Sequence, residues 1–381
     1  MKKLTDICDI QYGYAFDSKC FTEDSSYPQL VRIRDVKKGY SETYYSGDYP
    51  EEYILSEDDL LVGMDGEFNI ARWKCSGALL NQRVCRLTAK VGTNEEYLRF
   101  AMSKSLKEIE QRTAFVTVKH LSAKELNKLE LDVPELSKQD KIADTLSRLE
   151  RVIESRQEEL EKLDDLIKAR FVEMFGDPQI NSHGWDVVNI SEAVGGKVSN
   201  GFFAKRDDYV DDGNVSILGV ANIVNRMYSK VDELPRTYAD DKDIEKYEVK
   251  YGDILFCRSS LVTEGIGKAS IIPEYVQDNI LFECHVIRLP LDLNKCVPEF
   301  IQALSTMDFF RNQVIAQSKT ATMTTIGQDG ILKADIILPP INKQREFYDF
   351  VKQICKSKVA VQKALEETQV LFDSLMQQYF G

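Results

Sequence analysis

The chain has 381 residues, of which 43% are hydrophobic and 29% charged, enough for two domains that each have their own core. It contains no run of about eighteen apolar residues, so no membrane span is predicted. The first residues also lack the apolar stretch of a signal peptide, and we expect a cytoplasmic protein. The net charge of −13 argues mildly against nucleic-acid binding, but a local basic face can sit on an acidic protein.

The eight cysteines form no CxxC pair, and no His stands beside them at zinc-ligand spacing. In a reducing cytosol they are expected to be buried thiols rather than disulfides. The sequence therefore predicts no metal site and no cofactor site in this chain.

Residues 1–134 predict a first globular part of mixed structure. Short β-rich segments bounded by Gly, Asp and Pro include QLVRIRDV (29–36), DDLLVGM (58–64) and QRVCRLTA (82–89). A longer stretch at 95–112 is helical in character. The combination is typical of an α+β domain.

Residues 135–176 predict one long helix. Its apolar residues recur at alternating steps of four and three, which is the seam of a coiled coil. The interior holds no Pro or Gly, Ser137 is expected to cap the start, and Gly176 is expected to end the helix. The predicted interface residues of this helix are Ile142, Leu146, Leu149, Ile153, Leu160, Leu163 and Ile167.

Residues 177–339 predict a second globular part, and residues 340–381 a second long helix. The globular part again holds β-rich segments, VSILGV (215–220), GDILFCRS (252–259) and HVIRLPL (285–291), with one helix expected over 298–314. Asn342 is expected to cap the final helix. The predicted interface residues of that helix are Phe347, Val351, Ile354, Val361, Leu365, Phe372 and Leu375.

The two halves share a phrase and a spacing. VPELSKQDKI and PPINKQREF place Pro134, Lys138 and Gln139 each 205 residues before Pro339, Lys343 and Gln344, and the same offset continues along both helices. Further upstream, Tyr12–Phe16 is similar to Asn200–Ala204. We predict a pseudo-two-fold internal repeat in which the two helices form an antiparallel coiled coil within one chain. Self-association between chains is the alternative pairing.

This arrangement resembles the specificity subunit of type I restriction-modification enzymes. The motifs that carry the resemblance are LDVPELSKQDKI, ILPPINKQREF, FVEMFGDP, LLVGMDGEFNIARW and TVKHLSAKEL. The resemblance implies two target recognition domains, 1–134 and 177–339, that read the halves of a bipartite site in double-stranded DNA. The helices 135–176 and 340–381 would hold the two domains apart.

The resemblance also implies partners and an absence of chemistry in this chain. Two methyltransferase (modification) subunits would bind S-adenosylmethionine and methylate adenine N6, and motor/nuclease (restriction) subunits would use ATP and Mg. We expect Lys138, Gln139, Lys343 and Gln344 to contribute to the partner-subunit interface.

Basic and polar clusters recur in both halves and are the candidate DNA contacts, because Arg and Gln commonly read bases while Lys, Thr and Ser bind phosphate. Arg32 and Arg34 are expected to share one face of a strand. The candidates in the first half are Arg32, Arg34, Lys37, Lys38, Asn69, Arg72, Lys74, Gln82, Arg83, Arg112, Lys119 and His120. Those in the second half are Lys205, Arg206, Asn222, Arg226, Arg258, Lys319 and Thr322.

Other functions fit the sequence less well. The only Pro-Pro pair, at 339–340, lacks the Asn or Asp and the aromatic residue of an adenine methyltransferase loop. Asp65 and Glu67 lack the further Glu-x-Lys of a nuclease site, and could instead accept hydrogen bonds from cytosine. The main rival is a rod-like structural adaptor with two protein- or sugar-binding heads, which the acidic charge favours.

Overall fold

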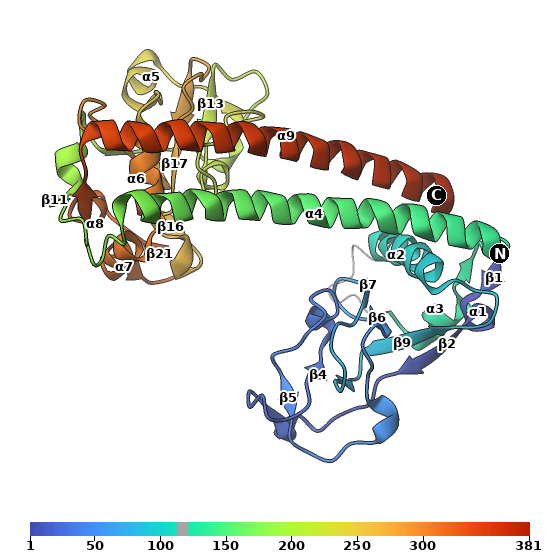
Figure 1. Ribbon diagram of the computed structural model, residues 1–381. Coiled ribbons are helices and arrows are strands. Elements are labelled where there is room, and N and C mark those ends of the chain that lie inside the picture. Colours follow the sequence, from blue (N-terminus) through green and yellow to red (C-terminus); the bar gives the residue numbers. More distant parts are fainter. Residues whose placement is uncertain (113–120) are drawn as a thin grey trace. The chain divides into compact units, whose positions relative to one another are not determined.

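The computed structural model describes residues 1–112 and 121–381 and shows a mixed α/β protein (Figure 1). It divides into two compact units. Unit 1 comprises Met1–Gln157 and Lys363–Gly381, and unit 2 comprises Glu158–Gln362. The long helices α4 (Leu136–Phe175) and α9 (Ile341–Phe380) each give one part to either unit. The division differs from the expected boundaries, which set the helices apart from the domains, because both helices bury side chains in the two cores.

Unit 1 is built on a four-stranded antiparallel sheet. Its order is β2 (Cys8–Tyr12), β9 (Val84–Ala89), β6 (Leu60–Gly63) and β7 (Asn69–Arg72). Helix α2 (Glu95–Arg112) packs against the sheet. The remaining strands are β1 (Lys2–Lys3), β3 (Phe21–Thr22), β4 (Leu30–Val31), β5 (Tyr44–Tyr45), β8 (Leu79–Leu80) and β10 (Glu130–Leu131); α1 (Leu4–Ile7) and α3 (Ala123–Lys128) complete the unit.

Unit 2 repeats this plan with different side chains. Its four-stranded antiparallel sheet has the order β12 (Ser199–Asn200), β19 (Val286–Pro290), β15 (Asp253–Cys257) and β17 (Ala269–Ile271). The other strands are β11 (Asp186–Asn189), β13 (Val215–Leu218), β14 (Arg236–Thr237), β16 (Ser259–Ser260), β18 (Ile280–Phe282), β20 (Lys319–Thr320), β21 (Thr324–Thr325) and β22 (Asp335–Leu338). The short helices are α5 (Asp241–Tyr247), α6 (Pro298–Ser305), α7 (Asp308–Ala316) and α8 (Gln328–Leu332).

Each unit also has strand pairs outside its main sheet, and two of these pairs correspond between the units. In unit 1 the strands β4 and β8 pair in parallel, and in unit 2 β13 and β18 do the same. The first strand of unit 1, β1, pairs with β10, and the first strand of unit 2, β11, pairs with β22. The four-stranded sheets and these two strand pairs therefore correspond between the units, whereas the three-stranded sheet β16-β21-β20 occurs in unit 2.

A glycine in each unit explains the short motif similarity near the start of each half. A Cβ on Gly13 would lie 2.0 Å from the Asn81 carbonyl oxygen, and one on Gly201 would lie 2.2 Å from that of Phe282. The Gly13 amide donates to the Val84 carbonyl at 2.9 Å, and the Gly201 amide donates to that of Val286 at 3.2 Å. Both positions require glycine because the backbone crosses another segment at close range.

The helices α4 and α9 both supply side chains to the hydrophobic core of each unit. In unit 1, Ile142 and Leu146 share a hydrophobic core with Phe372 and Leu375 of α9. In unit 2, Ile167 of α4 belongs to the core that also holds Phe347, Val351 and Ile354 of α9. The interface residues Leu149, Leu160, Leu163 and Leu365 are only partly buried.

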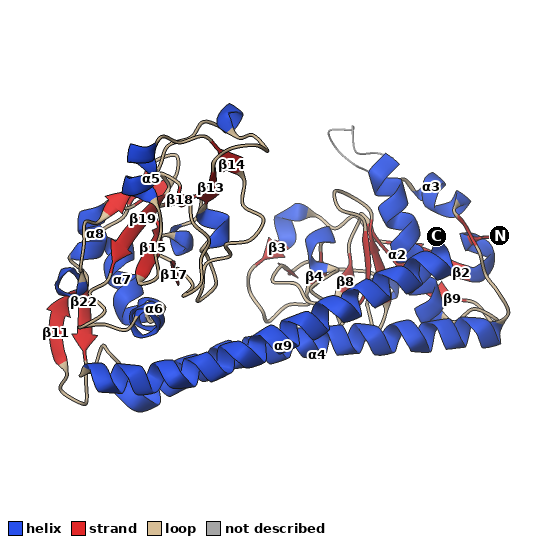
Figure 2. Cartoon of the chain, turned by 90° about the horizontal axis from the view of Figure 1, so that it is seen from above, coloured by secondary structure: helices blue, strands red, loops and turns tan. Residues whose placement is uncertain are grey.

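Two phenylalanines near the end of α4 anchor the core of unit 2. Phe171 and Phe175 are fully buried, and their rings contact those of Phe300 on α6 and Phe347 on α9 at centroid distances of 4.9 to 5.7 Å. Figure 2 shows α6 between the sheet of unit 2 and the long helices. The four-three spacing does not select these residues, since a helix of 3.6 residues per turn drifts from a strict seven-residue repeat.

Three local expectations are wrong. The helix expected over 298–314 is broken into α6 and α7. Ser137 and Asn342 lie inside the first turns of α4 and α9 rather than before them, so neither is the N-cap residue. Gly176 does end α4 as predicted, with φ of +77° and its amide donating to the Val172 carbonyl at 2.8 Å. Among the described helices, none is both long enough and apolar enough for a membrane crossing.

Candidate nucleic-acid interface

The loop between β6 and β7 is a centre of charged side chains in unit 1. The Met64 amide donates to the Arg83 carbonyl at 2.9 Å, which fixes the loop beside the turn before β9. The Arg83 guanidinium forms an ion pair with the nearly buried Asp65, and Lys37 forms one with the exposed Glu67. Asp65 and Glu67 therefore have cationic partners within the chain, which compete with a base for the carboxylate oxygens.

The segment that carries Arg32 to Lys38 is not a strand beyond Val31. Ile33–Asp35 form a turn of 3₁₀ helix, which the buried Asp35 carboxylate stabilises by accepting from the Arg32 amide at 3.0 Å. The expectation that Arg32 and Arg34 share a strand face is therefore wrong. Arg32, Arg34, Lys37 and Lys38 are nevertheless all exposed, as a DNA contact requires.

Two candidates of unit 1, Asn69 and Arg72, make contacts inside the unit. Asn69 is 9% exposed, and its amide nitrogen donates to the Glu67 carbonyl at 3.0 Å. Arg72 forms ion pairs with Glu96 and, at 2.9 Å, with Glu95, both on α2. Because these contacts hold both side chains inside the unit, the structure does not place Asn69 and Arg72 at a DNA surface. Lys74 and Gln82 are exposed, and so is Arg112 at the end of α2.

In unit 2 the equivalent 3₁₀ turn is uncharged. Asn222 takes the place of Asp35, and its side-chain oxygen accepts from the Gly219 amide at 3.1 Å. The half-buried Arg258 donates to the Cys284 carbonyl at 3.0 Å. Asn222 and Arg258 thus support loops, whereas Arg226 in the loop after the turn is exposed.

A small three-stranded sheet presents the other candidates of unit 2. Its order is β16, β21, β20, so the loop after β15 lies beside the β20–β21 hairpin. Lys319 and Thr322 are exposed on this hairpin, and Lys205 is exposed on a loop of the same unit. Lys119 and His120 lie outside the described residues, and so does the side chain of Arg206.

The two glutamines of the repeated phrase are not surface residues. Gln139 is 1% exposed, its Oε1 accepts from the Asn94 amide at 2.9 Å, and its Nε2 donates to the Pro134 carbonyl at 2.8 Å. Gln344 is 0% exposed and makes the same pair of bonds to the Val297 amide and the Pro339 carbonyl, at 2.9 and 2.8 Å. The expectation that both glutamines face a partner is therefore replaced by a structural role, while Lys138 and Lys343 are exposed.

Sequence reasoning missed three basic residues that line a cavity of unit 2 together with Arg226. These are Lys168 on α4, Lys268 just before β17, and Arg311 on α7. They are far apart in the sequence, and the folded arrangement of α4, β17, α7 and the 225–227 segment brings them to one place.

Comparisons with known proteins agree with this architecture. Residues 1–164 match the family model described as the type I restriction modification DNA specificity domain. The chain is 26% identical to the type I restriction enzyme EcoBI specificity subunit of Escherichia coli, over 98% of this chain and 83% of that protein. It is 21% identical to the MjaVIII specificity subunit of Methanocaldococcus jannaschii, over 80% of this chain and 74% of the relative.

The fold is also similar to that of solved structures. The crystal structure of the type I restriction-modification S subunit from M. genitalium superposes with a TM-score of 0.58 at 13% identity, over 100% of this chain and 95% of that one. A structure from work on complex assembly and conformational transition of the type I system gives a TM-score of 0.50 at 16% identity, over 99% and 96% of the chains. The family resemblance seen in the sequence motifs is confirmed.

Proposed function

We propose that this chain, a relative of the type I restriction enzyme specificity subunits, recognises a bipartite DNA sequence and directs adenine N6 methylation and cleavage by partner subunits. One observation carries the proposal: residues 1–164 match a DNA specificity domain, and unit 2 repeats the strand order of the matched unit on a separate core. Two readers of one topology with different exposed side chains suit a site of two different halves.

The helices α4 and α9 serve as the spacer between the two target recognition domains. The proposal of an antiparallel coiled coil is supported by the two cores, since the start of α4 and the end of α9 share the core of unit 1, and the end of α4 and the start of α9 share that of unit 2. A spacer of fixed length makes the number of unread base pairs fixed as well, because each pair advances DNA by about 3.4 Å.

The chemistry belongs to other subunits. This chain recruits two methyltransferase subunits that carry S-adenosylmethionine, and motor/nuclease subunits that use ATP and Mg, in the cytoplasm. Lys138 and Lys343, which are exposed at the starts of α4 and α9, are the remaining candidates for the docking surface of the methyltransferases.

The test is co-expression of the chain with the neighbouring N6-adenine methyltransferase gene, followed by single-molecule sequencing of the host DNA. A single split motif with a fixed gap is the expected result, and replacing residues 1–134 by those of a relative should change one half of it only. A stable complex that leaves the DNA without any methylated motif would favour the rival function, a structural adaptor with two protein- or sugar-binding heads.

A further inference from the structure

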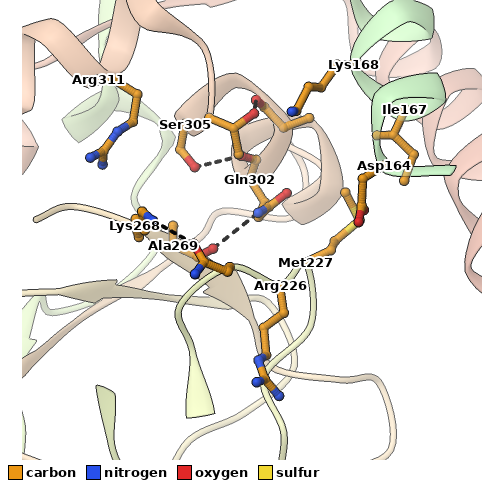
Figure 3. A pocket seen from close by; sticks show the side chains of 13 residues that line it. Asp164, Ile167, Lys168, Arg226, Met227, Lys268, Ala269, Gln302, Ser305 and Arg311 are labelled. Carbon is orange, nitrogen blue, oxygen red and sulfur yellow. Dashed lines mark hydrogen bonds between the residues drawn. The ribbon is translucent and has the colours of Figure 1, made fainter. Parts of the chain in front are cut away.

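A cavity of about 320 Å³ opens in unit 2 beside the C-terminal part of α4. Its wall is formed by α4, the 225–227 segment, the start of β17, α6 and α7 (Figure 3). Four cationic side chains line it, each from a different part of the chain: Lys168, Arg226, Lys268 and Arg311. Figure 3 shows Lys168 and Arg311 on opposite sides of Gln302, with Arg226 extending away from it.

The charges of this lining do not balance. Asp164 is its one carboxylate, and Asp164 forms an ion pair at 2.5 Å with Lys358 of α9, which is not part of the wall. Lys168 has Asp165 at 3.5 Å, both on the exposed side of α4. Among the described residues, the lining therefore carries an excess of positive charge. Like charges gathered in one site repel one another, and a bound anion reduces this repulsion.

Neutral acceptors hold two of the cations in place. Arg311 donates to the Ile266 and Glu264 carbonyl oxygens at 2.5 and 2.8 Å, and Lys268 donates to the side-chain oxygen of Asn225 at 2.6 Å. Such bonds orient a cation without neutralising it. Burial lowers the pKa of the Arg311 guanidinium, since the charged form loses hydration there.

The corresponding place in unit 1 is filled differently. Gln302 stands five residues after Val297, as Arg99 stands five residues after Asn94, and Val297 and Asn94 are the amides held by the paired glutamines. Arg99 forms ion pairs with Glu96 at 2.7 Å and with Glu150 at 2.5 Å. Gln302 is neutral, so this position of unit 2 differs from the arginine-centred ion pairs of unit 1.

We propose that this cavity binds a phosphate group. A phosphate offers several acceptor oxygens to the N–H donors of the lining, and its negative charge is opposite to the excess charge there. The phosphate could come from the DNA backbone or from a free phosphate ester. The site itself does not depend on the proposed function, and only the DNA source does.

In the experiment, inorganic phosphate is titrated into the full chain in a buffer of low ionic strength that contains no other phosphate. Isothermal titration calorimetry measures the binding. The cavity variant is Lys168→Gln with Lys268→Gln. Its matched control is Lys230→Gln with Lys295→Gln, two exposed lysines of unit 2 outside the cavity that have acidic neighbours at i ± 3. We expect the wild type and the control to bind phosphate alike and the cavity variant to bind at least tenfold more weakly. Equal binding by all three, or none by the wild type, overturns the site.

Duplex DNA then identifies the source of the phosphate. If the group belongs to DNA, the slope of log affinity against log salt concentration should become shallower by about one in the cavity variant, as for one lost phosphate contact. An unchanged slope together with weakened phosphate binding assigns the site to a free phosphate ester. A chain that binds phosphate but no DNA would refute the proposed function while leaving the site intact.

Discussion

At the scale of single residues, Gln139 and Gln344 explain why the chain repeats a short phrase. Each glutamine lies near the start of a long helix and binds the backbone just before another helix, α2 in unit 1 and α6 in unit 2. The side-chain amide supplies both an acceptor and a donor, which no other residue of similar length provides. The neighbouring lysines belong to the same repeated motif but are exposed. Two adjacent residues of one motif therefore have different roles.

Replacing either glutamine should destabilise the fold. Gln139→Ala or Gln344→Ala leaves the half-buried backbone amide of Asn94 or Val297 without its acceptor, and we expect a loss of about 1–3 kcal/mol in the free energy of unfolding. Lys138→Ala and Lys343→Ala are the matched controls and should change it by less than about 0.5 kcal/mol. Urea unfolding curves of the four variants measure this difference, and glutamine variants as stable as the lysine variants would contradict the role assigned here.

Asp253 should make the stability of unit 2 depend on pH. Burial in β15 raises its pKa from 3.8 to about 6, against the opposing effect of a hydrogen bond from the Lys250 amide. Because the folded state binds this proton more tightly than the unfolded state, the free energy of unfolding should fall as pH rises from about 4 to about 6.

Asp253→Asn should remove that fall, since the amide does not titrate, whereas Asp211→Asn at an exposed loop position should keep it. The measurement is urea unfolding at several pH values. The fluorescence of Trp185 in unit 2 monitors the unfolding in a Trp73→Phe background. The hypothesis fails if wild type and Asp253→Asn show the same pH profile.

At the scale of elements, an ion-pair chain ties the sheet of unit 1 to its long helix. Glu96 on α2 forms ion pairs with Arg72 of β7 and with Arg99. Arg99 in turn donates two hydrogen bonds, of 2.5 and 3.1 Å, to the Glu150 carboxylate of α4. Burial alone would raise the pKa of Glu96, but the two arginines hold it below its ordinary value. Carboxylates of this kind stabilise a fold above their unfolded pKa and lose that effect as the pH falls.

Breaking this chain should loosen α2 from α4. Arg99→Met keeps the length of the side chain and leaves Glu96 and Glu150 with one cation fewer. We expect a loss of about 1–2 kcal/mol, a range reduced because Glu150 is 36% exposed and partly screened. Arg148→Met removes only an exposed pair with Asp144 and should cost a few tenths of a kcal/mol. Thermal unfolding of the two variants distinguishes these values. Equal losses would mean that the linked ion pairs of Arg99 contribute no more than an exposed surface pair.

The elements predicted from the sequence were those whose cause is local. An unbroken apolar period predicts α2, α4 and α9 because a helix depends on neighbours three and four residues away. The break between α6 and α7 has no Gly or Pro to mark it, so periodicity alone runs through it. The contacts of the candidate site could not be predicted from the sequence in the same way. Lys37 and Arg83 form ion pairs with Glu67 and Asp65, which lie on a loop distant from both in the sequence.

At the scale of the whole molecule, α4 and α9 belong to both units. Unit 1 is completed by the last residues of the chain, Lys363–Gly381, and unit 2 begins in the middle of α4. Neither core is complete without a part of the helix that follows the other domain. Phe372 of α9 packs against the core of unit 1, and Phe171 of α4 contacts Phe347 in the core of unit 2. A change in the length of one helix alone would therefore disturb the packing in the core of at least one unit.

This dependence sharpens the test of the spacer. Four helix-forming residues inserted after Arg156, at the boundary between the units, lengthen α4 by about 6 Å. A matched insertion after Gln362 lengthens α9 equally, so the contacts inside each unit are kept. If the helices set the gap between the half-sites, the methylated motif should keep both halves and gain about two unread base pairs. The single insertion in α4 is the control and should lower stability, because α9 no longer matches it. A double insertion that folds and methylates the original motif would show that the gap is not set by these helices.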